Sequence, residues 1–467
     1  MSLRTIQMHF RGPSLGFMLL ALLLVALWIA GGASRASVPG QALSRGAAWS
    51  ALIAAILFAR RPTLDGRRAL LAVFAAIALV PITQLIPLPP AIWQALPGRA
   101  LLAASTPPGE AIPWRPLSLS PGSTLNALFS LVIPLTVFVL LGTIRGGERA
   151  WLPYLMIALI LASALAGLVQ FSGSRFDQPL INYTGDVSGT FANRNHFALF
   201  IAIGCLPVPL WASQAKGQLR WRAPIAIGVL LLLILTALAS GSRTGMLLTA
   251  VAVLAALLIA RENLVRQLRG RPAWLLPAAV GIIAALVLSA ILLGRATSVD
   301  RLVTTDIGQD MRVRGLDTVV SMIRTYFPAG TGLGSFDTMF RLHEPFNLLK
   351  PTYFNQAHDD YLGIVLDAGV LGLIALGAAI VWWLRSSIIV WQAVPAGMPP
   401  ATVSSIVLGR LGSAIVTLIL GASIVDYPAR TPTIMATAML AACLLAWGAT
   451  GAGQGDRQNR PPPDSIA

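Results

Sequence analysis

The sequence carries little charge for its length. Of its 467 residues, 11% are Asp, Glu, Lys or Arg, whereas 56% are hydrophobic, and the mean hydropathy is +0.74. A soluble domain has about 25% charged residues, so this composition excludes an ordinary soluble protein. The net charge is +16. Because the basic residues fall mostly between apolar runs, this surplus indicates membrane topology and not nucleic-acid binding.

Cysteine and histidine are also scarce, with two and four residues respectively. Cys205 and Cys443 both lie in apolar runs, which is typical of small core residues and not of a disulfide or a metal pair. Neither zinc-type ligand spacing nor a Walker-type phosphate loop occurs. Asp359 and Asp360 adjoin His358, but adjacent residues on a helix point in different directions. We therefore expect no metal and no cofactor.

Apolar runs are what the sequence has in abundance. A helix needs about 20 apolar residues to cross a bilayer, whereas a barrel strand would show about 10 residues of alternating character. The runs here are of the first kind, so the sequence predicts an all-α polytopic membrane protein with about 12 transmembrane helices. The predicted spans are 15–31, 47–60, 69–86, 123–142, 151–170, 196–213, 223–240, 244–260, 273–293, 361–384, 404–425 and 432–449.

The basic loops predict the orientation. The first apolar run follows Arg4 and Arg11 as in a signal peptide, but it is longer than the usual 7–15 residues, so we expect a retained span. Arg and Lys gather in four loops separated by even numbers of spans, and basic residues in short loops mark the cytoplasmic side. Both termini are therefore expected inside. These four loops are 59–68, 143–149, 216–222 and 261–271.

The chain is thus predicted to contain a membrane domain over 1–293 (spans 1–9), a large extracytoplasmic loop over 294–360, a second membrane segment over 361–450 (spans 10–12) and a disordered cytoplasmic tail over 451–467. A loop as long as 294–360 inside a compact protein is usually functional or disordered. It contains TVVSMIRTYF, which reads as an amphipathic surface helix, followed by a glycine-rich stretch that we expect to be a flexible turn. The proline-rich loop 87–122 is expected to lie on the outer membrane surface.

Two polar clusters stand at predicted outer ends of spans. The stretch SGTFANRNHFA contains Asn193, Arg194, Asn195 and His196 where the chain re-enters the membrane. It indicates either helix capping with an interfacial arginine or a polar pocket. The turn SGSRTG places Arg243 between two long apolar helices. An arginine at such a depth generally has an anionic ligand or a structural acidic partner such as Asp186.

The third cluster belongs to the large outer loop and the helix that follows it. Arg312 and Arg314 precede the amphipathic helix, and His358 with Asp359 leads into the tenth predicted span. The histidine is either an interface residue or part of a site. Several arginines at the bilayer surface suit a diphosphate, which they can grip with paired hydrogen bonds. A histidine beside a carboxylate suits general-base chemistry near neutral pH.

These same stretches carry a family likeness. GTFANRNHFA, SGSRTG, DMR, PAGTGLGSF and NQAHDDYLGIVLDAGVLG, in this order and spacing, resemble the O-antigen ligase and O-antigen polymerase superfamily of bacterial envelope proteins, over roughly residues 150–445. The resemblance implies a protein of the bacterial inner membrane. It also implies transfer of a glycan from an undecaprenyl-diphosphate carrier, outside the cytoplasmic membrane, to lipid A-core or to another glycan acceptor, without a metal. One departure is AHDD in place of the common AHND.

Carried over to this sequence, the resemblance implies that Arg243, Arg312 and His358 are catalytic. The two arginines would hold the diphosphate, and the histidine would take the proton of the acceptor hydroxyl in an inverting glycosyl transfer. Residues expected to bind substrate are Arg194, Asn195, His196, Arg314 and Asp359.

A transporter or flippase for a lipid-linked or anionic solute is the alternative function. Transporters tend to have paired halves with broken helices near the membrane midplane, and the sequence shows no such symmetry. Its polar residues gather at one predicted face and not at mid-depth, which favours the enzyme. The expected partners are therefore the lipid-linked glycan donor, the acceptor and membrane lipid, with no nucleic acid.

Overall fold

The computed structural model describes residues 12–107, 110–174, 178–181, 186–213, 219–268, 311–349, 356–394 and 397–459, together with residue 281. Helices dominate, and the sheet found in these ranges is one antiparallel pair of two-residue strands. The first elements are α1 (Leu15–Ala30), α2 (Pro39–Phe58), α3 (Arg68–Gln84), β1 (Pro87–Leu88), α4 (Pro90–Ala95), α5 (Ala100–Ala103), β2 (Arg115–Pro116), α6 (Pro121–Ser130), α7 (Val132–Thr143), η1 (Gly146–Trp151) and α8 (Leu152–Phe171). The later ones are α9 (Arg194–Cys205), α10 (Pro207–Ser213), α11 (Leu219–Ala239), α12 (Arg243–Leu268), α15 (Met311–Tyr326), α16 (Phe336–His343), η3 (Phe346–Leu348), α17 (Asp360–Gln392), α18 (Pro400–Ala422), η4 (Pro428–Arg430) and α19 (Pro432–Asn459).

The all-α polytopic architecture is confirmed. Among the described residues, nine helical segments are long and apolar enough to cross a membrane. Two predicted spans correspond to the shorter apolar helices α1 and α3, of 16 and 17 residues. The predicted span 273–293 lies outside the described residues, so the count of 12 stays a prediction.

Several element boundaries differ from those read in the sequence. α2 starts at Pro39, well before residue 47. The span 196–213 divides into α9 and α10, because Pro207 lacks the N–H that would continue the first helix. α19 continues to Asn459, so 451–459 is helical and not part of a disordered tail. The amphipathic helix of the large loop is present as α15.

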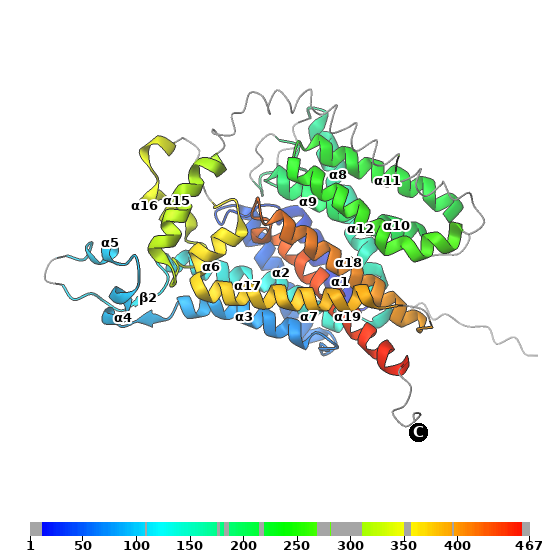
Figure 1. Cartoon of the computed structure of the whole chain (residues 1–467), viewed down its shortest axis with the longest axis horizontal. Helices are drawn as coiled ribbons and strands as arrows, with labels where there is room; N and C mark the ends of the chain where they lie inside the picture. The colour runs from blue at the N-terminus through cyan, green and yellow to red at the C-terminus, as the bar shows by residue number, and fades with distance from the viewer. Residues whose placement is uncertain are drawn as a thin grey trace, which may run out of the picture.

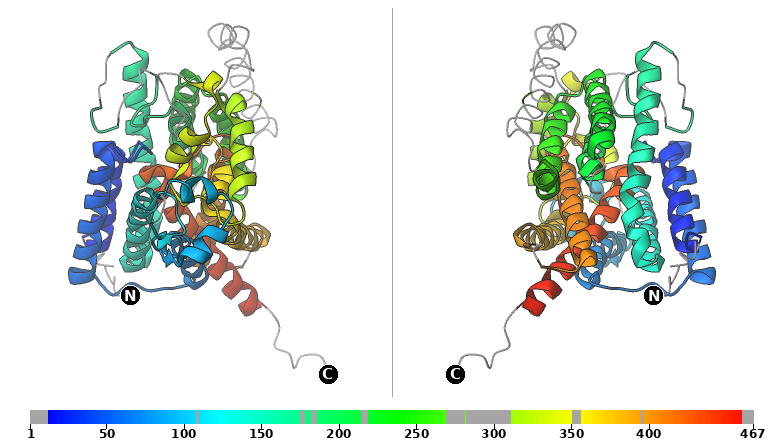
Figure 2. Two further views of the ribbon diagram at one scale, coloured as in Figure 1. Left: turned by 90° about the vertical axis from the view of Figure 1, so that its left-hand side faces the viewer. Right: turned by 90° about the vertical axis from the view of Figure 1, so that its right-hand side faces the viewer.

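The helices form a bundle whose outer loops build a separate shoulder. α3 and α17 run side by side, α8, α9, α11 and α12 form a neighbouring group, and α15 and α16 pack beside the beginning of α17 (Figure 1). α4, α5 and β2 project beyond the end of α3. In both views of Figure 2, the pair α1–α2 lies at one edge of the bundle.

Two of the basic loops meet at one end of the bundle, which we call the basic end. The backbone of Thr63 donates to Gly142 O at 3.0 Å. The guanidinium of Arg149 stacks on Trp447, with 4.1 Å from Cζ to the ring centroid. At the same end of α19, Gly448 packs against Gly409 of α18.

Neighbouring side chains extend this end across α12, because Arg410 approaches Glu262 at 3.6 Å. The basic loops therefore share one end of the structure, as a common membrane side requires.

A break in α17 organises the opposite end. The helix is interrupted at Gly369, where φ is 56° and ψ is −142°. Residues 328–335, PAGTGLGS, fill the break, and we call them the plug segment. Thr331 N donates to Leu366 O at 3.0 Å, Gly332 N donates to Asp367 O at 2.8 Å, and Val370 N donates to Pro328 O at 3.0 Å. The plug thus satisfies backbone groups that the broken helix leaves open.

The glycines of the plug allow close packing and do not form the flexible turn that the sequence suggested. Gly330 has φ of 76°, and a Cβ there would lie 2.8 Å from both Asp367 O and Gly369 N. A Cβ at Gly369 would overlap the carbonyl oxygen of Pro328. These positions need glycine for both backbone angle and space.

Two buried side chains tie the plug to the proline-rich outer loop. Gln84, at the end of α3, donates to Asp367 O and accepts from Leu333 N, each at 2.9 Å. Arg99 donates to Leu117 O at 2.8 Å and to Gly330 O at 3.2 Å. The loop 87–122 is therefore packed against the plug segment, and not simply laid on a membrane surface.

The break in α17 gives a direct test of this packing. We expect Gly369→Ala to lower the free energy of unfolding by about 1–3 kcal/mol from the strained φ alone, with a lower melting temperature of the detergent-purified protein. Gly377→Ala is the matched control in the same helix, because a Cβ at Gly377 meets no atom within 4 Å. Equal melting temperatures for the two variants would contradict this account of the break.

Candidate functional site

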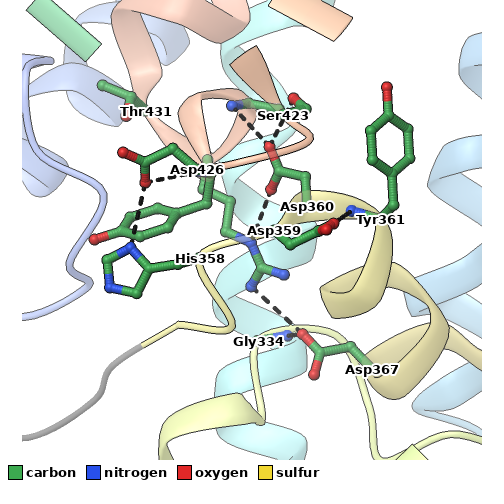
Figure 3. Close-up of polar contacts among 12 residues, drawn as sticks. Gly334, His358, Asp359, Asp360, Tyr361, Asp367, Ser423, Asp426 and Thr431 are labelled. Carbon is green, nitrogen blue, oxygen red and sulfur yellow. Dashed lines mark hydrogen bonds and ion pairs between the residues drawn. The ribbon is translucent and has the colours of Figure 1, made fainter. Parts of the chain in front are cut away.

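The buried carboxylate of Asp426 is the centre of the polar end. It lies in the short connection between α18 and α19, and its side chain is 3% exposed. Oδ2 accepts hydrogen bonds from Asn193 Nδ2 at 3.1 Å and from Asn195 Nδ2 at 2.6 Å. Oδ1 lies 3.6 Å from His196 Nε2 and 3.5 Å from His358 Nδ1. Four side chains from two distant stretches of sequence therefore converge on one carboxylate (Figure 3).

These contacts set the charge state of Asp426. Burial alone would raise the pKa of the carboxyl, but hydrogen bonds and charge from His196 and His358 outweigh it and hold the pKa well below the ordinary value. Asp426 is therefore an anion at neutral pH. A fixed negative charge beside an imidazole favours its protonated form and fixes which ring nitrogen faces outward.

His358 has the geometry expected of a reactive imidazole. It directly precedes the N-cap of α17, its side chain is 20% exposed, and its backbone φ of 52° is rare for a residue other than glycine. Backbone strain of this kind concentrates at functional sites. The ring packs against Tyr427 with 5.0 Å between centroids. With Nδ1 directed at Asp426, Nε2 is the nitrogen left for a substrate.

His196 supports Asp426 and does not line an open entrance. Its ring is 1% exposed, and Nδ1 lies 2.9 Å from Thr431 Oγ1. The ring meets Tyr427 edge-on, with 5.2 Å between centroids. Tyr427 therefore packs against both histidines, and His196 acts through the carboxylate they share.

The predicted arginines divide into those the structure brings to this network and those whose position it leaves undescribed. Ser242 Oγ donates to Asn195 Oδ1 at 2.8 Å, which connects the SGSRTG turn to Asp426 through one amide. Arg243 follows directly as the first residue of α12, and it is exposed. Arg194 pairs with Asp186 at 3.8 Å, so the acidic partner considered for Arg243 belongs to its neighbour.

The two loop arginines lie at the start of α15. Arg314 donates to Asn347 O at 3.0 Å, which joins α15 to η3. Arg312 lies within the same helix, but its side chain is outside the described part of the structure. Its predicted contact with a diphosphate therefore stays a prediction, as does that of Arg314.

Asp359 is the N-cap of α17. Its Oδ1 accepts from Tyr361 N at 2.8 Å and from Leu362 N at 3.0 Å. Asn and Asp are about equally good at this position, which explains why AHDD can stand where AHND is common. Both of these contacts use the residue for backbone capping; its predicted substrate contact stays a prediction.

Beside the histidines lies a second charged group, made of Asp360, Asp367 and Arg430. Arg430 Nε lies 3.4 Å from Asp360 Oδ1, and Nη1 lies 3.4 Å from Asp367 Oδ2. Asp360 also accepts from Ser423 Oγ at 3.0 Å, and Asp367 accepts from Gly334 N at 3.2 Å. The group joins the 423–430 connection to α17 and to the plug segment (Figure 3).

Sequence reasoning missed Asp426 and Arg430. Both belong to DYPAR, in the short connection between the predicted spans 404–425 and 432–449. The signal was there: two charged residues and a tyrosine in a six-residue outer turn need partners as much as Arg243 does. What the sequence could not supply was the partner, because Asn195 is 231 positions from Asp426.

An apolar cavity of about 400 Å³ lies next to this polar end. It runs between α3, α7, α17, α18 and α19, and its walls are almost entirely hydrocarbon. Leu333, Ile364 and Ala429 line it near the polar end, and Leu70 and Ala442 line it further along. Such a cavity can hold part of an isoprenoid or acyl chain.

Comparison with known proteins follows from this geometry. Residues 227–377 match the family model described as O-antigen ligase. The matched range contains Arg243, Arg312 and His358, and it ends before Asp426. No curated protein matches the chain. With its apolar helices and its matched domain, the chain is a multi-pass membrane protein of the O-antigen ligase and O-antigen polymerase superfamily, whose role lies in envelope glycan biosynthesis.

Proposed function

We propose that this protein transfers a glycan from undecaprenyl diphosphate to a hydroxyl of a glycan acceptor or of lipid A-core, at the outer face of the bacterial inner membrane. The observation that carries the proposal is the His358–Asp426 pair, 3.5 Å apart. It lies away from the end where the basic loops gather, and it is linked to the turn that presents Arg243. Basic loops mark the cytoplasmic side, so this polar end faces outward.

In the proposed step, His358 Nε2 takes the proton of the acceptor hydroxyl while its oxygen attacks the anomeric carbon. The bond from that carbon to the diphosphate oxygen breaks, and undecaprenyl diphosphate leaves with the electron pair. Attack from the opposite face inverts the anomeric centre. Asp426 holds the imidazole and stabilises the imidazolium that forms. Arg243 and Arg312 stabilise the charge that develops on the diphosphate.

The apolar cavity beside the site supports a lipid-anchored donor. An undecaprenyl chain stays in the bilayer while its diphosphate remains at the surface, so the reacting end and the tail need adjoining polar and apolar spaces. Residues Leu333, Ile364 and Ala429 bring the cavity next to Arg430 and Asp367. We propose that part of the carrier tail occupies this space.

Single alanine replacements test the mechanism. We expect Arg243→Ala, Arg312→Ala and His358→Ala each to lower the transfer rate about 10²–10³-fold, because each removes a contact made in the transition state. The rate is measured in membranes from the amount of glycan moved to the acceptor, at matched protein levels.

Matched controls are available on the same elements. Arg324 of α15 and Arg266 of α12 are exposed, so Arg324→Ala and Arg266→Ala should keep nearly full activity. His343 of the same outer loop contacts Tyr326 and Met339 O and serves as the histidine control. Full activity in all three site variants would remove the mechanism.

Asp426 gives a second prediction. We expect Asp426→Asn to lower kcat about 10²-fold or more with little change in the KM for the donor, because the amide keeps the size of the side chain but loses the charge that holds the imidazolium. A raised donor KM with unchanged kcat would instead indicate that Asp426 binds substrate and does not support His358.

Surface-glycan gels from a deletion strain identify which acceptor the protein serves. A single repeat unit on lipid A-core indicates loss of a polymerase, whereas full-length polymer left on its carrier indicates loss of a ligase. Unchanged gels in an otherwise competent strain would refute the proposed transfer.

A further inference from the structure

A second, smaller cavity lies near the opposite end of the bundle. It has a volume of about 200 Å³ and is enclosed by α8, α10 and α11. Its lining is almost entirely apolar and includes Ile157, Leu210, Trp211 and Val229. It lies near the basic end, because Ser213, at the end of α10, accepts a hydrogen bond from Gln267 near the end of α12. The proposed glycan transfer makes no use of this cavity.

A single guanidinium adjoins the cavity. Arg222, in the first turns of α11, donates to Trp211 O at 3.1 Å. Its Cζ lies 5.2 Å from the ring centroid of Trp211 and 5.2 Å from that of Trp221. The cation is therefore held by two indole faces and one carbonyl, all of them neutral.

No acid in the described part of the chain lies within ion-pair distance of Arg222. The neighbouring stretch 214–218 contains Lys216 and no acidic residue in its sequence. A half-buried arginine next to hydrocarbon is costly without an anionic partner. Its positive charge is thus available to a ligand that carries a phosphate.

We propose that this cavity is a binding site for an anionic phospholipid of the cytoplasmic leaflet. One acyl chain enters the apolar hollow, and the headgroup phosphate pairs with Arg222. Three observations support this ligand over a soluble anion: the walls are hydrocarbon, tryptophans flank the cation as they do at membrane interfaces, and the site lies where basic loops attract anionic lipid.

Lipid titration of the detergent-purified, full-length protein tests this site. We expect phosphatidylglycerol to raise the melting temperature more than phosphatidylcholine with the same chains, and native mass spectrometry to detect a retained phosphatidylglycerol. Arg222→Gln should weaken that binding about tenfold, and Ile157→Trp, which fills the hollow, should reduce it as well. Arg266→Gln, on the exposed end of α12, should bind as the unaltered protein does.

Three results would overturn the proposal: undiminished phosphatidylglycerol binding by Arg222→Gln, equal binding of the two lipids, or the same stabilisation by inorganic phosphate alone. If Arg222→Gln is itself poorly folded, Arg222→Lys provides the second variant. It keeps the charge and should retain most of the preference for phosphatidylglycerol over phosphatidylcholine.

A different set of contacts carries a second inference, which rests on the proposed function. Asp360 lies two residues after His358, and it binds both ends of the connection that holds Asp426. Asp360 N donates to Ser423 O at 2.9 Å, and its carboxylate accepts from Ser423 Oγ at 3.0 Å, from Ala429 N at 3.3 Å and from Arg430 Nε at 3.4 Å. The start of α17 and the Asp426 turn are thereby fixed to each other.

We propose that Asp360 and Arg430 are positioning residues that keep the carboxylate of Asp426 against His358. Neither needs to touch substrate, because Arg430 is already paired with Asp360 and Asp367. Two carboxylates against one guanidinium also make this group a poor binder of a diphosphate.

Kinetics of Asp360→Asn tests this role. We expect kcat to fall about tenfold or more at an unchanged donor KM, and the acidic limb of the pH–rate profile to move to lower pH, because an imidazole held less closely to a carboxylate loses its proton more easily. Asp360→Glu should restore part of kcat. The titratable groups around His358 in this comparison are Asp359, Asp360, Asp426, Tyr427 and His196.

Asp337→Asn is the matched control, since Asp337 forms an exposed ion pair with Arg341 at 3.0 Å in α16. An Asp360→Asn protein with unaltered kcat and pH profile would overturn the positioning role while leaving the proposed transfer intact. Activity retained in His358→Ala would instead overturn the transfer mechanism.

Discussion

The polar end of this membrane protein depends on one buried anion. A carboxylate removed from water is unfavourable unless its lone pairs are used, and Asp426 meets that requirement with two amides and two imidazoles. Satisfying the anion brings α9, the start of α17 and the α18–α19 connection into contact. The same arrangement that makes burial tolerable also orients His358. Stability and reactivity are therefore coupled at this residue.

The break in α17 serves the same end of the molecule by a different physical route. An interrupted helix exposes backbone groups that hydrocarbon cannot satisfy, and the plug segment supplies their partners. Because Gln84 and Arg99 also bind the plug or its partner residues, the two outer loops and α3 are joined at this position. The large loop that carries Arg312 is thus anchored next to the helix that follows His358.

Much of the architecture was readable from the sequence. Long apolar runs predicted the helices, and basic loops separated by even numbers of spans predicted a shared end. Alternation of sides then placed Arg194, Arg243 and His358 at one face. The Asp426 network could not be read in this way, because its bonds join residues more than 200 positions apart. The role of the plug glycines was equally hidden, since composition suggests flexibility whereas positive φ angles and close backbone contacts appear only in three dimensions.

The capping role of Asp359 has a consequence for how sequences of this superfamily are compared. Because both of the hydrogen bonds described for its carboxylate go to backbone amides of α17, an amide side chain would serve there equally well. Exchange between aspartate and asparagine at this position is therefore expected to drift freely during evolution. It should carry no information for sorting ligases from polymerases, whereas the neighbouring Asp360, with bonds to three separate groups of the α18–α19 connection, is the more informative position.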